Sequence, residues 1–367
     1  MNDPYMGGTH LPDIALVMPV FSGGKLIAFS AAMTHHQDIG GMSPGSVPTN
    51  ATEIFQEGIR IPPLKYSSKG IINDTLLKLL KLNVRLPDSF QGDLNAQIAA
   101  CEIGRRRLCD LENRYGVETL KSIFSDLLNR SELMTRQAIQ TLPDGSHSYV
   151  DYLDNDGIDL DTPIKIEVSV LVQGDSVHID FSGTSQQVRG PFNLMPSGAY
   201  AAAYFAVHAM TDPSIPTNGG CFRPIKLMLP PKSIVNPEEP APVNARTSTM
   251  KRVAGCIIGA LGQFVPERAP ADAAGEMLLL AFGGDRIDGT RYVVGELIAS
   301  GSGASEGKDG VDVIETDGTN CMNLPVEALE MDVPIRVHRT ELNTGSGGSG
   351  KFRGGLGLVR EYEILHG

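Results

Sequence analysis

Two apolar segments near the start of the chain predict a β-hairpin. Residues 14–21 (IALVMPVF) and 26–34 (LIAFSAAMT) are rich in residues that favour strands, and Ser22-Gly23-Gly24-Lys25 between them is typical of a tight turn. In an antiparallel hairpin the start of the first strand lies beside the end of the second. The segments that flank the hairpin, 10–13 and 35–38, are therefore expected to lie close together.

Apolar residues then recur with the 3.6-residue period of helices. This pattern predicts helices over residues 73–82, 88–114 and 117–142, the first capped by Asn73 and the second stopped by Gly116. The third helix has one apolar face, made of Leu120, Phe124, Leu127, Met134 and Ala138.

The rest of the chain mixes strand and helix patterns. Apolar residues alternate with mostly polar ones over residues 164–172 and again over 177–181, which predicts a second hairpin across Gln173-Gly174-Asp175. Helices are predicted over 196–211 and 247–264, strands over 277–282, 292–299 and 358–362, and residues 300–320 are glycine-rich and acidic.

These patterns predict an α+β fold, with mixed strands, a central helical block and glycine-rich loops. Three segments can be distinguished: strands and a loop over 1–65, the helical block over 66–143, and a mixed α/β remainder over 144–367. We expect them to form one continuous domain, because a chain of 367 residues is long enough for a single large core.

Composition favours a cytoplasmic protein that binds neither nucleic acid nor membrane. The formal net charge is −12 and the sequence pI is about 5.1, which argues against partners that are themselves anionic. The five cysteines are scattered without a Cys-x-x-Cys pair and are expected to be reduced thiols. No secretory signal opens the chain, and the predicted apolar helices are too short to cross a bilayer.

Three histidines and two aspartates flank the first predicted hairpin and form a candidate metal site. His10 and Asp13 precede its first strand, and His35, His36 and Asp38 follow its second. Imidazole and carboxylate groups are ligands of divalent ions such as zinc or manganese. Only one of two adjacent histidines on a strand can face the ion. The alternative is that a His-x-x-Asp spacing arises by chance in a chain with this many His and Asp residues.

Two further groups of polar residues are candidates for a substrate pocket. Glu57 and Arg60 lie in a long segment, 40–63, in which glycines and prolines forbid regular structure over most of its length. They are candidate catalytic residues, with ordinary solvated charges as the alternative. Asn218, Gly219 and Arg223 lie on a loop shaped by glycine and proline and are candidates for substrate binding. No nucleophile motif stands out.

The segment 345–351 (GSGGSGK) resembles a phosphate-binding loop but lacks two of its requirements. Phe352 replaces the Ser or Thr that such a loop needs, and the glycines that follow cannot start the helix whose N-terminus would face phosphate. We therefore expect a glycine-rich turn between strands, and no nucleotide bound by this chain alone.

Seven motifs, in this order, carry a resemblance to one family. They are NDPYMGGTHLPD from residue 2, HHQDIGGMSPGS from 35, TEIFQEGIRIPP from 52, GDLNAQIAA from 92, HIDFSGTS from 178, NGGCFRPI from 218 and GSGGSGKFRGGLGLVREYE from 345. The chain resembles the hydantoinase B/oxoprolinase family from residue 2 to about residue 363. Members of that family normally start earlier and end later, so the resemblance implies that this chain is truncated at both ends.

The family comprises B subunits of ATP-dependent hydantoinases, the corresponding half of 5-oxoprolinase, and subunits of acetone-type carboxylases. The resemblance implies a hydrolase of cyclic amides in a hetero-oligomer, in which an A-type subunit uses ATP to phosphorylate the amide oxygen and this subunit hydrolyses the activated intermediate. It also implies a divalent metal, zinc or manganese, held by His10, Asp13 and His35, with His36 and Asp38 as alternates.

Two alternative functions remain open from the sequence. One is an alpha-type subunit of an acetone- or acetophenone-like carboxylase, whose metal would polarise a small ketone. The other is a non-catalytic assembly subunit with a structural metal or none. A site with an open coordination position favours catalysis, whereas a closed site with four protein ligands favours a structural role.

Overall fold

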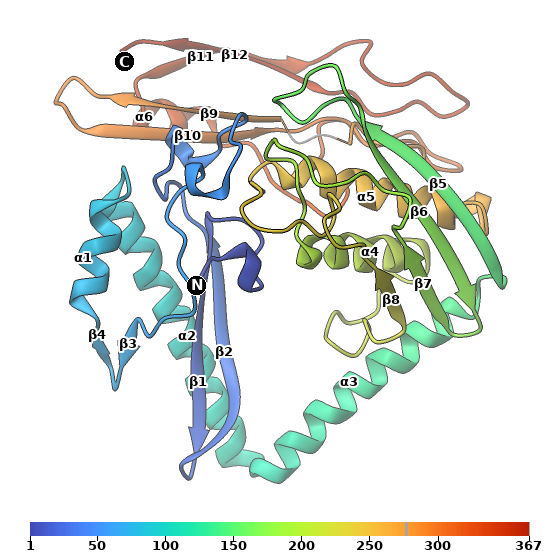
Figure 1. Cartoon of the computed structure of the whole chain (residues 1–367), viewed down its shortest axis with the longest axis horizontal. Coiled ribbons are helices and arrows are strands. Elements are labelled where there is room, and N and C mark those ends of the chain that lie inside the picture. The colour runs from blue at the N-terminus through green and yellow to red at the C-terminus, as the bar shows by residue number, and fades with distance from the viewer. Residues whose placement is uncertain (276–277, 367) are drawn as a thin grey trace.

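The fold is α+β, as predicted, and the computed structural model describes residues 1–275 and 278–366 (Figure 1). The helices are α1 (Asp74–Leu82), α2 (Pro87–Tyr115), α3 (Val117–Ile139), α4 (Pro196–Met210), α5 (Arg246–Leu261) and α6 (Val326–Asp332). The strands are β1 (Asp13–Ser22), β2 (Lys25–His35), β3 (Ser67–Ser68), β4 (Ile71–Ile72), β5 (Gly145–Leu153), β6 (Ile164–Gln173), β7 (Ser176–Asp180), β8 (Ile225–Met228), β9 (Leu278–Asp285), β10 (Arg291–Ile298), β11 (Ile335–Leu342) and β12 (Leu358–Ile364).

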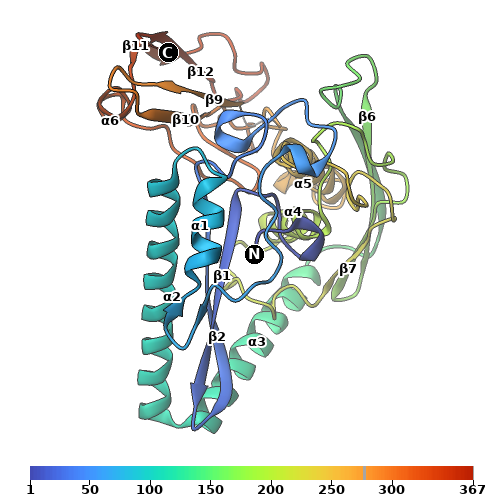
Figure 2. The same cartoon turned by 60° about the vertical axis from the view of Figure 1, so that its left-hand side comes forward.

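The predicted N-terminal hairpin is present as β1 and β2. The two strands pair antiparallel from Asp13 opposite His35 to Ser22 opposite Lys25, and the glycines of the turn have the positive φ angles that such a tight turn requires. Helix α2 runs along one face of the hairpin (Figure 2). Gln97 of α2 fixes this packing, because its Nε2 donates to the carbonyl oxygens of Ile14 (2.7 Å) and Ala32 (3.1 Å).

The helical block agrees with the predicted bounds, but the predicted apolar face of α3 is confirmed only in part: Leu120 is buried, and Phe124, Met134 and Ala138 are half-buried. Leu127 is 53% exposed, whereas Ser131 and Thr135 are buried. The reason is a loop that approaches this helix closely. Asn218 Nδ2 donates to Ser131 Oγ (2.7 Å), and a Cβ added at Gly220 would lie 1.9 Å from a backbone oxygen of α3. The small polar residues Ser131 and Thr135 are therefore buried beneath this loop, on a part of α3 that the apolar pattern did not mark as buried.

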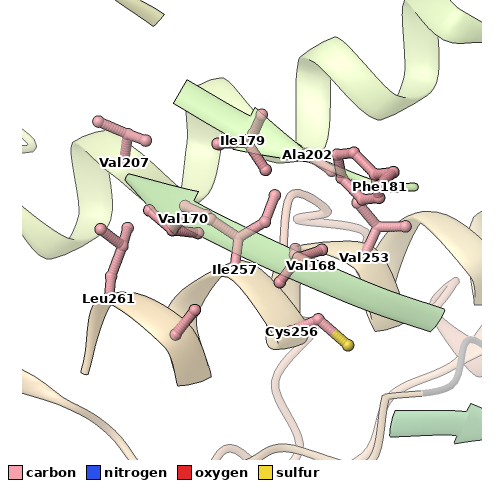
Figure 3. Packing of buried hydrophobic residues seen from close by; sticks show 14 of the residues in the cluster. Val168, Val170, Ile179, Phe181, Ala202, Val207, Val253, Cys256, Ile257 and Leu261 are labelled. Atoms are coloured by element: carbon pink, nitrogen blue, oxygen red, sulfur yellow. The ribbon is translucent and has the colours of Figure 1, made fainter. Parts of the chain in front are cut away.

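A four-stranded sheet forms the main core with α4 and α5. Its strand order is β5-β6-β7-β8, antiparallel except for the parallel pair β7 and β8. Helices α4 and α5 cover one face (Figure 1). Figure 3 shows Val168 and Val170 of β6 packed against Ile257 of α5, with Val207 of α4 beside them. Burying each such side chain contributes about 1.5–3 kcal/mol. Strand β5 was not predicted, because most of its residues are exposed and its sequence does not alternate.

Two further hairpins, β9–β10 and β11–β12, lie with α6 at one end of the molecule (Figure 1). The strands predicted over 292–299 and 358–362 are confirmed, as is most of that over 277–282; Met277 lies outside the described residues. A buried Glu296 on β10 accepts hydrogen bonds from Arg360 and Tyr362 on β12 and so joins the two hairpins.

The hydrophobic clusters cross the predicted segment boundaries. Leu11 and Ile14 share a core with Phe90 and Leu94 of α2, and Val243 from the C-terminal part also joins it. Of the helices in residues 1–275 and 278–366, none is long and apolar enough to span a membrane.

We expect Ile257→Ala to lower the free energy of unfolding by about 2–5 kcal/mol, because it leaves a cavity at the contact between α5 and the sheet. Urea denaturation followed by circular dichroism measures this change. The matched control is Leu82→Ala, at an 83% exposed position of α1, which should change stability by no more than about 0.5 kcal/mol. Equal effects of the two substitutions would contradict the assignment of this core.

Candidate active site

The open end of the β1–β2 hairpin brings His10, Asp13 and His35 together. Asp13 and His35 are paired residues at the ends of the two strands. The turn before β1 carries His10 back over Asp13, so that His10 Nδ1 lies 2.8 Å from Asp13 Oδ2. The rings of His10 and His35 have centroids 4.9 Å apart. The predicted convergence of the two flanking segments is therefore confirmed.

Arg246, the first residue of α5, also reaches this cluster. Its Nη2 lies 3.0 Å from Asp13 Oδ2, and Thr9 Oγ1 donates to the same oxygen. Sequence reasoning missed Arg246, because it is 233 positions away from Asp13 and no local motif marks it. In the sequence, Arg246 is marked only by its position directly before the helix predicted from residue 247.

The electrostatic environment keeps both imidazoles neutral and the carboxylate ionised. Burial and the nearby Arg246 lower the pKa of His10 to about 3, and burial lowers the pKa of His35. Burial opposes ionisation of Asp13, but His10 and Arg246 hold its pKa below the usual range. Two neutral imidazoles and a carboxylate are the protonation states that a divalent metal requires of its ligands.

The chemistry of this donor set fits a metal ion. His10 Nδ1 is buried and, in the part of the chain that the structure describes, has no hydrogen-bond partner of acceptable geometry. Asp13 is already engaged by Thr9 and Arg246, and among residues 1–275 and 278–366 no three His, Cys, Asp or Glu side chains are arranged to hold an ion. The metal ligands His10, Asp13 and His35 therefore stay a prediction, supported by residue type, protonation state and proximity.

The alternates His36 and Asp38 are committed to other contacts. His36 points to the opposite face of the hairpin, where its Nε2 lies 3.2 Å from Gln97 Oε1 and its ring packs on Phe90. The carboxylate of Asp38 is buried and accepts hydrogen bonds from loop backbone and from Arg85. Neither side chain joins the cluster.

Glu57 is a buried carboxyl group linked to the cluster through Arg246. Its Oε1 accepts hydrogen bonds from the backbone N–H groups of Val243 and Asn244, both at 2.9 Å. Its Oε2 is buried and has no hydrogen-bond partner among the residues that the structure describes. Burial raises the pKa of Glu57 to about 8, against the opposing effects of those two hydrogen bonds and of Arg246. A pKa of about 8 means that Glu57 carries a proton at neutral pH, as a general acid must.

Arg60, the other candidate catalytic residue, forms ion pairs outside the cluster. Its Nε lies 3.1 Å from Asp3 and its Nη1 lies 2.6 Å from Glu239, while the guanidinium covers the rings of Tyr5 and Phe55. These contacts join the N-terminal segment to the loop that precedes α5. The catalytic role of Arg60 stays a prediction.

The candidate substrate-binding residues Asn218, Gly219 and Arg223 lie away from the cluster. Asn218 and Arg223 contact α3, the latter through an ion pair with Glu132 (2.8 Å). Their loop lies toward the C-terminal end of α4, because Phe222 of the loop stacks on Tyr204. The N-terminal segment that carries His10 contacts the start of α4 instead, where Ser197 Oγ donates to the carbonyl oxygen of Gly8. The structure does not bring these residues and the cluster together, and their role stays a prediction.

The sequence profile described as hydantoinase B/oxoprolinase matches residues 1–367. The chain belongs to the hydantoinase B/oxoprolinase family, which confirms the resemblance seen in its motifs.

Relatives and solved structures cover nearly all of this chain. The B subunit of a putative D-/L-hydantoinase from Pseudomonas sp. (strain NS671) is 36% identical over 376 residues, which are 99% of this chain and 63% of that protein. The crystal structure of ATP-dependent caprolactamase from Pseudomonas jessenii has a TM-score of 0.90 and 32% identity, over 99% of this chain and 64% of its own. A nucleotide-free structure of acetone carboxylase has a TM-score of 0.91 over 99% of this chain and 51% of its own; at 21% identity it shows the shared fold alone. This chain thus spans about two thirds or less of the length of these proteins.

We expect Glu57→Gln to become more stable relative to the unsubstituted protein as the pH rises. The folded state holds the Glu57 proton up to a pH of about 8, whereas the unfolded chain releases it near 4.5. The stability that Glu57 contributes is therefore present below pH 4.5 and is lost as the pH rises to about 8. Glutamine keeps the acceptor for Val243 and Asn244 without this loss. Urea denaturation at a series of pH values measures the difference, and a difference independent of pH would show that Glu57 is ionised in the folded protein.

Proposed function

We propose that this chain is the metal-dependent hydrolytic component of an ATP-dependent cyclic-amide hydrolase, which opens a lactam or hydantoin ring. The observation that carries the proposal is the cluster of His10, Asp13 and His35 with Arg246 beside it. Two neutral imidazoles and an ionised carboxylate that lie close together are the donor types of a zinc or manganese site. The names of the hydantoinase and caprolactamase relatives support the substrate class.

Each group of the cluster has a role in this scheme. His10, Asp13 and His35 would hold the ion, which when bound supplies a Lewis acid and favours ionisation of water near neutral pH. Arg246 keeps Asp13 ionised and places a positive charge where negative charge develops during attack on the amide carbon. Glu57, protonated at neutral pH, is the candidate donor of the proton that the ring nitrogen takes up on cleavage.

The need for ATP follows from the chemistry of the substrate. An amide resists attack by water, whereas an amide phosphorylated on its oxygen is a far better electrophile. In this chain the glycine-rich segment 345–351 leads to strand β12, and Lys351 pairs with Glu306. This arrangement supports assigning ATP binding and phosphorylation to a partner of the hydantoinase A type, with this chain acting on the activated amide.

We expect His10→Ala and His35→Ala to lose bound zinc or manganese, because each substitution removes one of the three proposed ligands. Plasma mass spectrometry of the purified protein measures the metal content. ATP-dependent ring opening, assayed with the A-type subunit present, should fall by about 100-fold. The control is His178→Ala, an exposed histidine on β7. Unchanged metal content in both cluster variants would refute the assigned ligands, whatever the activity.

We expect no saturable binding of ATP to this chain by calorimetry, because no helix begins after residue 351 in the part of the chain that the structure describes, so none can receive a phosphate group. Hydrolysis of ATP and ring opening should appear only on addition of the A-type subunit. Lys351→Ala tests whether the glycine-rich segment 345–351 binds ATP. Saturable ATP binding that this substitution abolishes would contradict the division of labour.

A further inference from the structure

A cavity of about 680 Å³ lies beside α5 in a region that the proposed function does not use. Tyr149, Phe205 and Ile258 form its apolar wall, and the segment 315–320 forms much of its polar wall. This segment belongs to the glycine-rich, acidic stretch that stood out in the sequence.

The cavity is separate from the candidate active site, although α5 contributes to both. Arg246 at the first position of α5 contacts the metal-ligand candidates, whereas Gly255, Ile258 and Gly259 line the cavity. At a rise of 1.5 Å per residue, Arg246 and Gly255 are roughly 14 Å apart along the helix.

Glu315, which lines the cavity, has a buried carboxylate with one oxygen that accepts no hydrogen bond among the described residues. Its side chain is 1% exposed, and its Oε2 accepts hydrogen bonds from Lys251 Nζ (2.9 Å) and Thr319 Oγ1 (2.7 Å). Its Oε1 is buried without a hydrogen-bond partner among the described residues. A buried acceptor without a donor is costly, so a donor brought by a ligand would stabilise this wall.

The charges around the cavity favour a cationic ligand. Asp272 and Asp317 line it together with Glu315. The cations nearby are engaged, Lys251 with Glu315 and Arg252 with both Asp151 and Asp272. Burial raises the pKa of Asp317, against the opposing effects of a hydrogen bond from Thr316 and of Lys251. A positive charge in the cavity would stabilise its ionised form.

We propose that this cavity binds an organic ammonium compound, with the ammonium group donating to Glu315 and Asp317 and a compact hydrocarbon body against Tyr149, Phe205 and Ile258. An ammonium group has only donors, which matches two carboxylates. A bare metal ion would leave the apolar wall in contact with water, and a neutral polar compound would leave the excess negative charge unpaired.

Calorimetry of the purified chain with cyclohexylammonium chloride tests this proposal, with cyclohexanol as the neutral probe of similar shape. We expect saturable binding of the ammonium compound and affinity for cyclohexanol that is weaker by about tenfold or more. Asp317→Asn should weaken ammonium binding by about tenfold while it keeps the Lys251–Glu315 pair. The control is Asp126→Asn on α3, an exposed position that makes the same change in net charge and should leave binding unchanged.

Three results would overturn the proposal: equal affinity for cyclohexanol, unchanged binding in Asp317→Asn, or displacement of the ammonium compound by magnesium chloride at a stoichiometric concentration. Glu315→Gln is a second variant, expected to abolish binding if circular dichroism shows that it folds. If it does not fold, the Asp317→Asn result decides.

Discussion

The register of one strand pair determines the candidate active site. Asp13 lies opposite His35 because β1 and β2 pair as they do, and a slip of one residue would present His36 in place of His35. Contacts on the other face of the hairpin prevent that slip, since Gln97 of α2 bonds to the backbone of both strands and to the ring of His36. The geometry of the cluster therefore depends on packing between the hairpin and α2.

Charge pairs connect distant parts of the chain, and α5 supplies the cation in three cases, of which the Lys251–Glu315 pair is fully buried. Arg246 contacts Asp13, Lys251 pairs with Glu315, and Arg252 bridges Asp151 and Asp272. A buried pair such as Lys251–Glu315 adds little net stability compared with apolar packing, but removal of one partner leaves an uncompensated buried charge. These charge pairs therefore select one arrangement of α5 against the N-terminal hairpin, the central sheet and the acidic loop.

Local patterns predicted the helices and the N-terminal hairpin well, but they missed several strands, among them β5 and β11, and most long-range contacts. The hairpin over 13–35 and the helices α1, α2 and α4 follow from turn chemistry, caps and apolar periodicity, which are local. The buried face of α3 was predicted only in part, because the loop at 218–220 that packs on it is remote in sequence. The convergence of His10, Asp13 and His35 could be predicted because a single hairpin makes it. Arg246 could not, because only the folded chain brings it to Asp13.

The spacing of the cations along α5 makes this helix intolerant of changes in length. Inserting one residue between Arg246 and Lys251 would turn one relative to the other by about 100° and move them roughly 1.5 Å further apart along the axis. Because the partners of both residues lie on different parts of the fold, no rigid shift of the helix could restore both pairs. Natural variation in this family should accordingly place insertions in the loops on either side of α5 and leave its first two turns constant in length.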